Sequence, residues 1–270
     1  MYKEFYHLKE EPFNITADPD FFFSSTHHSE AFSNLVYGIN HRKGILVVTG
    51  EIGTGKTTLI KTLFNRFNQK TKTALILNPN FSEIQLLQLI MKDLTIPGLF
   101  KNKLELINAL NTFLLKETGR GNNVVLIIDE AQNLSVRQLE QIRLLSNLET
   151  GKQKLLQIVL VGQPELAEKL KLPELRQLKQ RLAVHYHICP LARPELSGYI
   201  DHRLKIASIN LSRQVHFTDK AIDLIFEESK GIPRTINILC DRALLAGYVQ
   251  ETLSIDENII NNCVAEVILK

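Results

Sequence analysis

The sequence predicts an α/β fold, in which a five-stranded parallel sheet with flanking helices is followed by a smaller, all-helical C-terminal domain. Short apolar runs rich in β-branched residues alternate with longer stretches of helical spacing through most of the chain. After about residue 189 the apolar runs stop and only helical spacing continues. Because each return to a parallel strand needs a crossover, usually a helix, this alternation indicates a parallel sheet covered on both faces.

Five apolar runs have the length and composition of buried parallel strands, at residues 45–49, 72–77, 124–128, 155–161 and 184–188. Helical spacing occupies the intervals between them, at residues 57–67, 82–94, 103–116 and 135–148. Ser135 opens the last of these stretches and is a suitable N-cap. The order of the elements therefore favours strands joined by helices rather than by hairpins.

Four further helices are predicted in the C-terminal part, at residues 193–207, 218–228, 233–249 and 256–269. Gly231 and Pro233 interrupt the helical spacing there and mark a turn. We therefore expect two domains. Residues 1–190 form the α/β domain, and residues 191–270 form the helical domain.

The composition is that of an ordinary globular chain, and it excludes several classes. The 270 residues carry 32 Lys and Arg against 29 Asp and Glu, and a net charge of +3 is too small to be by itself an electrostatic footprint for nucleic acid. The longest uniform apolar runs span a handful of residues, far fewer than the ~20 that cross a bilayer. The N-terminus mixes charged and aromatic residues, unlike a secretory signal. Cys189, Cys240 and Cys263 have apolar neighbours and are expected to be unpaired, buried thiols in a reducing cytoplasm.

A glycine-rich turn joins the first predicted strand to the first predicted helix and matches the pattern G-x-x-x-x-G-K-[ST]. Its residues are Gly50, Glu51, Ile52, Gly53, Thr54, Gly55, Lys56, Thr57 and Thr58. Glycines let the backbone curl so that several N–H groups point at a phosphate chain, and the helix N-terminus adds partial positive charge. In this motif Lys56 reaches the β- and γ-phosphates, and the Thr57 hydroxyl is a ligand of Mg²⁺. The turn is predicted to bind ATP.

The predicted strand at residues 124–128 ends in two carboxylates, Asp129 and Glu130. Open α/β sheets bind their ligands at the carboxyl ends of the strands. Successive residues of a strand project to opposite faces, so one carboxylate can hold Mg²⁺ while the other polarises a water. We assign Asp129 to the metal and Glu130 to the water, which makes hydrolysis the expected reaction.

Two amide side chains follow other predicted strands. Gln163 comes directly after the run at residues 155–161 and could contact the γ-phosphate, or it could be an ordinary turn residue before Pro164. Asn78 directly follows the run at residues 72–77. The sequence is about equally compatible with Asn78 as a turn residue and as a residue of the site.

With these residues in view, the chain resembles the AAA+ ATPases, and within them the general secretion pathway protein A ATPases and the mannose-sensitive haemagglutinin pilus biogenesis ATPases. The resemblance extends over nearly the whole chain. Besides the two nucleotide motifs it rests on residues 12–19 (PFNITADP), 129–132 (DEAQ), 143–150 (RLLSNLET), 162–165 (GQPE), 175–181 (LRQLKQR) and 231–239 (GIPRTINIL). It implies a P-loop NTPase fold of AAA+ type, in which the catalytic strand lies beside the first strand and residues 191–270 form a helical lid.

The resemblance also implies roles for single residues. Gln163 falls where the family has its first sensor of the γ-phosphate, and Asn78 where a polar residue restrains the catalytic glutamate until a partner arrives. Arg234 matches the second sensor, which couples the lid to the nucleotide. Arg181 matches the arginine finger that is offered to the nucleotide of a neighbouring subunit, with Arg176 as the competing candidate. A solvated helix face is the alternative explanation of both arginines.

The N-terminal segment, residues 1–44, is expected to pack near the adenine, with Phe13, Ile15 and Pro19 as candidate apolar walls. For the run of phenylalanines at residues 21–23 we favour an ordinary core position.

The expected function is Mg²⁺-dependent ATP hydrolysis at the interfaces of a homo-oligomer, such as a hexameric ring formed on ATP binding. The favoured role is assembly or remodelling of an envelope machine for secretion, type IV pilus formation or polysaccharide export. The protein would be cytoplasmic and would reach the inner membrane through a partner, because the chain ends at residue 270 with no membrane segment or peptidoglycan-binding domain. It would be the shorter pilus-type form or an excised domain.

Two other functions are compatible with the same motifs. One is a DNA-binding ATPase that regulates transposition, for which residues 41–43 and 61–72 supply some positive charge, although a solvated helix face explains these residues equally well. The other is a scaffold that binds ATP and scarcely hydrolyses it. Glu130 argues against the scaffold, because it supplies a base for hydrolysis.

Overall fold

The computed structural model describes residues 2–209 and 215–268, which fall into two compact units. The sheet unit consists of Ser29–Ile52 and Leu63–Ile188. The helical unit consists of Met1–His28, Gly53–Thr62 and Cys189–Lys270. Residues 1–28 and most of the phosphate-binding turn thus belong to the same unit as the C-terminal helices, while the boundary of the ATPase domain at residue 190 stays a prediction.

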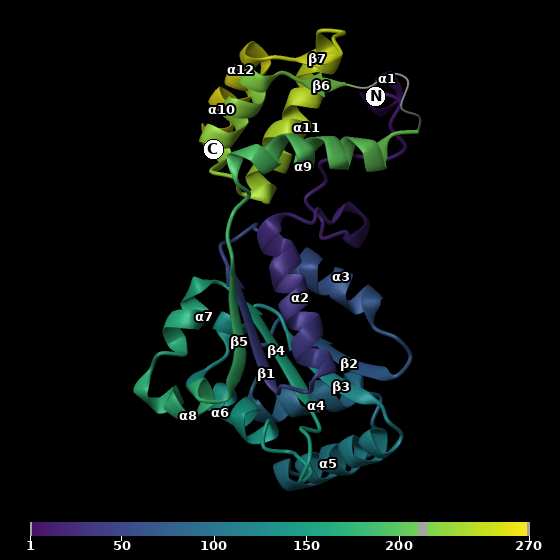
Figure 1. Ribbon diagram of the computed structural model, residues 1–270, viewed down its shortest axis with the longest axis vertical. Coiled ribbons are helices and arrows are strands. Elements are labelled where there is room, and N and C mark those ends of the chain that lie inside the picture. The colour runs from purple at the N-terminus through teal and green to yellow at the C-terminus, as the bar shows by residue number, and fades with distance from the viewer. Residues whose placement is uncertain (1, 210–214, 269–270) are drawn as a thin grey trace. The chain divides into compact units, whose positions relative to one another are not determined.

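The sheet unit contains the five expected strands, all parallel and in the order β2-β3-β4-β1-β5 (Figure 1). Their bounds are β1 (Ile45–Gly50), β2 (Thr71–Ile76), β3 (Asn123–Ile128), β4 (Gln157–Gly162) and β5 (Leu182–Ile188). Every residue of β1 and β4 is buried, as the apolar composition of these runs predicts.

The strand order corrects one expectation. The catalytic strand was expected beside the first strand, but β4 lies between β3 and β1. β4 pairs Val161 with Val48 of β1 and Leu160 with Ile128 of β3, so its backbone groups are bonded on both sides. Sequence patterns mark strands but carry no signal for their lateral order, which is set by non-local pairing. As a consequence the carboxyl ends of β1, β4 and β3 lie next to one another, and this is the edge where such sheets bind ligands.

Side chains of β3 alternate between the two faces of the sheet. Val124, Leu126 and Ile128 of β3 belong to the larger core, together with residues of α4 (Glu83–Asp93) and α5 (Lys103–Gly119). That core also includes residues of α6 (Val136–Leu145). α2 (Thr26–Asn40) packs against the sheet through Gly38, where an added Cβ would lie 2.5 Å from a methyl carbon of Leu46. The remaining elements are α3 (Lys56–Arg66), η2 (Ala131–Asn133), α7 (Pro164–Lys169), η3 (Pro173–Leu175) and α8 (Arg176–Lys179).

The helical unit contains the four expected C-terminal helices and a second apolar core. Its elements are α1 (Tyr2–Phe5), η1 (Pro19–Phe21), α9 (Arg193–Ala207), α10 (Asp219–Ser229), α11 (Pro233–Val249), α12 (Glu257–Ile268), β6 (His216–Phe217) and β7 (Ser254–Ile255). The two short strands pair in parallel and were not expected, because two residues are too few to show alternation. Residue 269, the expected end of the last helix, lies outside the described residues.

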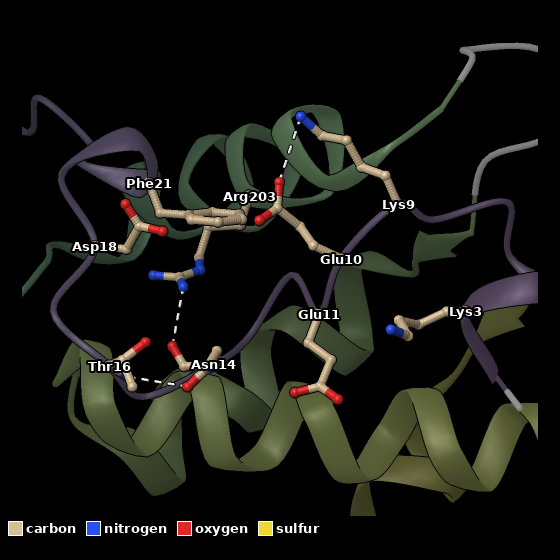
Figure 2. A pocket seen from close by; sticks show the side chains of 9 residues that line it. All are labelled: Lys3, Lys9, Glu10, Glu11, Asn14, Thr16, Asp18, Phe21 and Arg203. Atoms are coloured by element: carbon tan, nitrogen blue, oxygen red, sulfur yellow. Dashed lines mark hydrogen bonds and ion pairs between the residues drawn. The ribbon is translucent and has the colours of Figure 1, made fainter.

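The first part of the N-terminal segment, residues 2–28, contributes side chains to the core of the helical unit. Phe13 and Phe21 are buried there, which agrees with a core position for Phe21, whereas Ile15 is 57% exposed. The buried guanidinium of Arg203 on α9 donates hydrogen bonds to the carbonyl oxygens of Pro12 (2.6 Å) and Asn14 (3.0 Å). Figure 2 shows this guanidinium beside the Phe21 ring, next to a polar cavity of about 170 Å³. Residues 12–21 are therefore packed against α9 of the helical unit.

Two further expectations can be compared with the described part of the chain. Cys189, Cys240 and Cys263 form no disulfide, and the last two are buried. No helix there combines the length and the hydropathy needed to cross a bilayer. In the same residues, no three His, Cys, Asp or Glu side chains group closely enough to hold a metal ion.

Candidate nucleotide-binding site

The glycine-rich turn has the backbone conformation of a phosphate-binding loop. Gly53 and Gly55 have φ values of +83° and +90°, in the left-handed region that other residues rarely adopt. α3 begins at Lys56, directly after the turn, and the Leu59 N–H already donates to the Gly55 carbonyl. Thr54 and Lys56 are buried. A helix N-terminus preceded by such a turn directs backbone N–H groups and partial positive charge at one point, which suits a phosphate chain.

Two segments of the helical unit contact this turn. The Arg234 N–H, in the first turn of α11, donates to the Gly53 carbonyl at 3.2 Å, and an added Cβ on Gly53 would lie 2.6 Å from the Arg234 Cβ. On another side, Nε2 of the buried His28 lies 2.8 Å from the Thr54 carbonyl oxygen. Arg234, expected to be the second sensor, thus starts a helix that touches the phosphate loop, with its own side chain exposed.

His28 is held as a neutral imidazole. Its Nδ1 lies 2.7 Å from the Ser25 hydroxyl and its Nε2 lies against the Thr54 carbonyl, so donation from Nε2 and acceptance at Nδ1 satisfy both ring nitrogens. Burial lowers the pKa of His28 below its ordinary value of 6.5, opposed by the bond to Thr54 and by the charge of Glu195. The carbonyl oxygen of Thr54 is therefore held by a hydrogen bond from the His28 imidazole.

In the sheet unit, the two predicted carboxylates lie just past the end of β3. Asp129 is buried, and its N–H donates to the Ile76 carbonyl at 2.8 Å. Its Oδ1 accepts a hydrogen bond from the Glu130 N–H at 2.9 Å. Glu130 has φ 51° and ψ 37°, a left-handed conformation, and is half-buried. The two carboxylates are therefore separated by a turn of the backbone, and not by the strand alternation that the sequence predicted.

The Glu130 carboxylate is held by two amide side chains. Gln132 Nε2 donates to Glu130 Oε2 at 2.5 Å, and Gln163 Nε2 donates to the same oxygen at 3.2 Å. Gln132 Oε1 in turn accepts the Gln163 backbone N–H at 3.1 Å. Gln163 directly follows β4, so the inserted strand brings the expected first sensor to the expected base.

Asn78 has a different environment from the one expected. It lies just after β2, is exposed, and makes no hydrogen bond to Glu130 within the described part of the chain. Gln132 and Gln163, and not Asn78, donate hydrogen bonds to the Glu130 carboxylate here, and the role that the resemblance implied for Asn78 stays a prediction.

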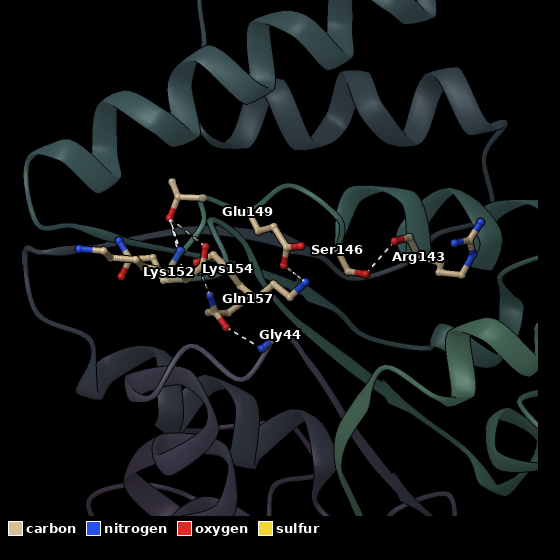
Figure 3. A network of polar contacts seen from close by, with 9 residues as sticks. Gly44, Arg143, Ser146, Glu149, Lys152, Lys154 and Gln157 are labelled. Atoms are coloured by element: carbon tan, nitrogen blue, oxygen red, sulfur yellow. Dashed lines mark hydrogen bonds and ion pairs between the residues drawn. The ribbon is translucent and has the colours of Figure 1, made fainter.

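Arg181 and Arg176 are both exposed and lie at the opposite edge of the sheet from Glu130. Arg181 directly precedes β5, whose first residue pairs with Ile45 at the amino end of β1. Six residues of strand span roughly 20 Å, so Arg181 cannot serve the carboxyl edge of its own sheet. The pKa of Glu149, which belongs to the polar network shown in Figure 3, is lowered by its hydrogen bond and ion pair with Lys154 and, to a smaller extent, by the charge of Arg181.

That network closes the amino edge of the sheet. Glu149 forms an ion pair with Lys154 in the loop that leads into β4, and the buried Gln157 accepts a hydrogen bond from the Gly44 N–H at 2.9 Å (Figure 3). Positive and negative side chains are thus interspersed in this loop.

Two residues of the site were missed by the reasoning from sequence. Gln132 was part of a quoted motif but had no role, although its position two residues after Glu130 is a detectable signal. His28 follows another histidine in a polar stretch, and nothing local in the sequence indicates that it reaches the phosphate loop.

Comparison with known proteins agrees with this geometry. Residues 39–170 match the family model described as an AAA domain. The chain carries an AAA domain. It is 41% identical over 251 residues to general secretion pathway protein A of Aeromonas hydrophila, in an alignment that covers 93% of this chain and 45% of that protein. The resemblance drawn from the sequence is therefore confirmed, and the chain spans less than half the length of this relative.

Solved structures show the same fold. The Aeropyrum pernix ORC2 protein in its ADP form has a TM-score of 0.67 at 15% identity, covering 96% of this chain and 73% of that one. Cdc6p from Pyrobaculum aerophilum has a TM-score of 0.67 at 16% identity, covering 93% and 71%. The RuvB Holliday junction branch migration motor of Thermotoga maritima has a TM-score of 0.51 at 17% identity, covering 88% and 68%. The AAA domain thus has the P-loop AAA+ fold, with a helical C-terminal region.

Proposed function

We propose that this AAA domain hydrolyses ATP with Mg²⁺ at the interfaces of a homo-oligomer. The observation that carries the proposal is the phosphate-binding turn itself, in which two glycines adopt left-handed conformations immediately before a helix that begins with a buried lysine. Lys56 would hold the β- and γ-phosphates, and the backbone N–H groups of residues 50–58 would bind the remaining phosphate oxygens.

The residues that would hold Mg²⁺ have the right chemistry. A threonine hydroxyl at position 57 and a carboxylate at position 129 are hard oxygen ligands, which Mg²⁺ prefers. The bound ion would neutralise charge on the phosphate oxygens. Asp129 is suited to this task because it is buried directly after a central strand and is anchored through its own N–H to β2.

Glu130 would act on the attacking water. Water attacks the γ-phosphorus, its proton passes to the Glu130 carboxylate, and ADP leaves. A half-buried carboxylate whose orientation is held by two amides is suited to this role, because a base must be positioned as well as present. Gln163 and Arg234 would contact the γ-phosphate, and Arg181 would complete the site of a neighbouring subunit.

The similarity to general secretion pathway protein A favours a role in bacterial envelope secretion or in the related assembly of pili or export machines. The ATPase would drive assembly or remodelling of such a machine from the cytoplasmic side, through a partner in the inner membrane.

The test uses the full chain and two variants. We expect wild-type protein to release phosphate from ATP only when Mg²⁺ is present, at a rate that rises more than linearly with protein concentration. Lys56→Ala should abolish binding of a fluorescent ATP analogue, or leave it bound unproductively. Glu130→Gln should bind the analogue and lower kcat on the order of 100-fold or more.

Two outcomes would contradict the proposal in different ways. A wild-type protein that binds the analogue and releases no phosphate at any concentration is a nucleotide-gated scaffold. A Glu130→Gln variant that turns over at the wild-type rate shows that another group acts as the base.

A further inference from the structure

We infer that Gln132 is a positioning residue for ATP hydrolysis, because it joins the catalytic carboxylate of Glu130 to the γ-phosphate sensor Gln163. One amide bridges the two: its nitrogen donates to Glu130 Oε2 at 2.5 Å, and its oxygen accepts the Gln163 N–H at 3.1 Å. The inference rests on the proposed function, since it assigns a task within that reaction.

Only one orientation of the Gln132 amide allows both of these hydrogen bonds. An amide offers one accepting oxygen and one donating NH₂ group, whereas a carboxylate only accepts and a backbone N–H only donates. Turning the Gln132 amide over would set oxygen against oxygen at Glu130 and NH₂ against N–H at Gln163. Glu130 and Gln163 together therefore fix the orientation of the Gln132 amide.

The backbone around the bridge makes room for it. An added Cβ on Gly162 would lie 2.8 Å from Gln132 Oε1 and 3.2 Å from the Gln132 backbone nitrogen, so only glycine fits there without displacement. Lys169 on α7 donates from Nζ to the carbonyl oxygens of Gln132 (2.5 Å) and Leu134 (2.8 Å). The turn that carries Gln132 is thus fastened to the helix that Gln163 precedes.

The contacts leave one carboxylate oxygen for the reaction. Both amides donate to Oε2 of Glu130, and within the described residues no group donates to Oε1. Holding one oxygen fixes the plane of the carboxylate and directs the other outward, which is what a base needs in order to receive a proton from a water at a defined place. Without Gln132, the longer bond from Gln163 would be the remaining side-chain restraint.

The first test removes the bridge. In Gln132→Ala we expect kcat to fall roughly 10- to 100-fold, the range seen when a group that orients a reactive residue is lost, with the KM for ATP and the affinity for a fluorescent ATP analogue unchanged. Asn133→Ala is the matched control, because Asn133 belongs to the same turn and its side chain is exposed. Circular dichroism and thermal unfolding of both variants check the fold.

The second test keeps the shape of the Gln132 side chain and replaces its amide NH₂ group by a carboxylate oxygen. Gln132→Glu retains an oxygen for the Gln163 N–H but sets a carboxylate against Glu130 Oε2. Two carboxylates at this distance repel each other, so the Glu130 side chain should leave the place that the two amides give it. We expect kcat to fall at least as far as in Gln132→Ala while the affinity for the fluorescent ATP analogue stays unchanged, a split that a glutamine needed only for the fold would not produce.

The outcomes separate this inference from the proposed function. If wild-type protein does not hydrolyse ATP, the proposed function fails. If wild-type protein hydrolyses ATP and Gln132→Ala does so at the same rate or faster, the positioning role of Gln132 is wrong. If Gln132→Ala unfolds, the decision passes to Gln132→Glu, whose unchanged kcat would likewise overturn it.

Discussion

At the scale of single residues, the site depends on backbone conformations that strand and helix patterns do not describe. Glu130 leaves the end of β3 in a left-handed conformation, which costs a residue other than glycine on the order of 1 kcal/mol or more and persists only where its surroundings specify it. Here the Asp129 carboxylate accepts the Glu130 N–H, and two amides hold the side chain. The sequence predicted that strand alternation separates Asp129 from Glu130, but β3 ends at Ile128 and the alternation does not apply beyond it.

His28 is expected to make stability depend on pH. Its pKa is lowered in the folded protein by burial, an effect opposed by the bond to Thr54 and the charge of Glu195 and reinforced by the charge of His27. Between that lowered value and about 6.5, the ordinary pKa of histidine, the unfolded chain binds more protons, so the free energy of unfolding should fall as the pH is lowered through this window. Urea denaturation of wild type and His28→Gln at a series of pH values measures it.

The difference between the two proteins isolates this histidine, because burial also lowers the pKa values of His185 and His202. His28→Gln can retain a donor for the Thr54 carbonyl and has no proton to gain, so its stability should depend less on pH in this window. His28→Ala leaves that buried carbonyl without its partner and should cost about 1–3 kcal/mol at every pH. Equal slopes for wild type and His28→Gln would contradict the assignment.

At the scale of the elements, local signals for helix starts predicted the structure well. Ser135 was expected to open a helix, and it caps α6 in a capping box in which its hydroxyl accepts the Gln138 N–H and the Gln138 side chain accepts the Ser135 N–H. The Gln138 amide also donates to the Phe81 carbonyl at 2.7 Å, so the cap links α6 to the segment after β2. Such caps are visible in sequence because both partners lie within four residues.

We expect Ser135→Ala to lower the free energy of unfolding by about 1 kcal/mol, since the first turn of α6 would lose an acceptor for one of its unpaired N–H groups. Ser135→Asp is the matched variant, because aspartate caps a helix about as well as serine and its charge suits the helix N-terminus. Chemical denaturation of both variants distinguishes loss of the cap from disturbance by any substitution. A Ser135→Asp variant as unstable as Ser135→Ala would contradict a capping role.

At the scale of the whole molecule, the sheet separates the candidate base from the candidate arginine finger. Glu130 lies at the carboxyl edge, and Arg181 precedes β5 at the amino edge, so Arg181 could reach a triphosphate only in another copy of the chain. Under the proposed function, such an arrangement would make hydrolysis conditional on assembly, because the positive charge would arrive only when subunits meet.

Arg181→Ala should therefore bind ATP with wild-type affinity and have a kcat lower by a factor on the order of 1,000. When it is mixed with wild-type protein at constant total concentration, the activity should fall below the sum of the two components, because each assembly then contains incomplete interfaces. Arg176→Ala is the matched control, an exposed arginine one short helix away. Activities that are simply additive for Arg181→Ala and less than additive for Arg176→Ala would make Arg176 the finger.

The sequence by itself determined the five strands, the phosphate-binding turn and the two carboxylates after β3. These depend on local patterns: apolar runs, glycine spacing and charges at the end of a strand. Only the tertiary structure decided that β4 lies between β1 and β3, that Gln132 bridges Glu130 and Gln163, and that His28 holds the Thr54 carbonyl. The physical reason is that each of these depends on pairing between segments distant in the chain, and no local period or propensity encodes which distant partner a strand edge or a side chain will find.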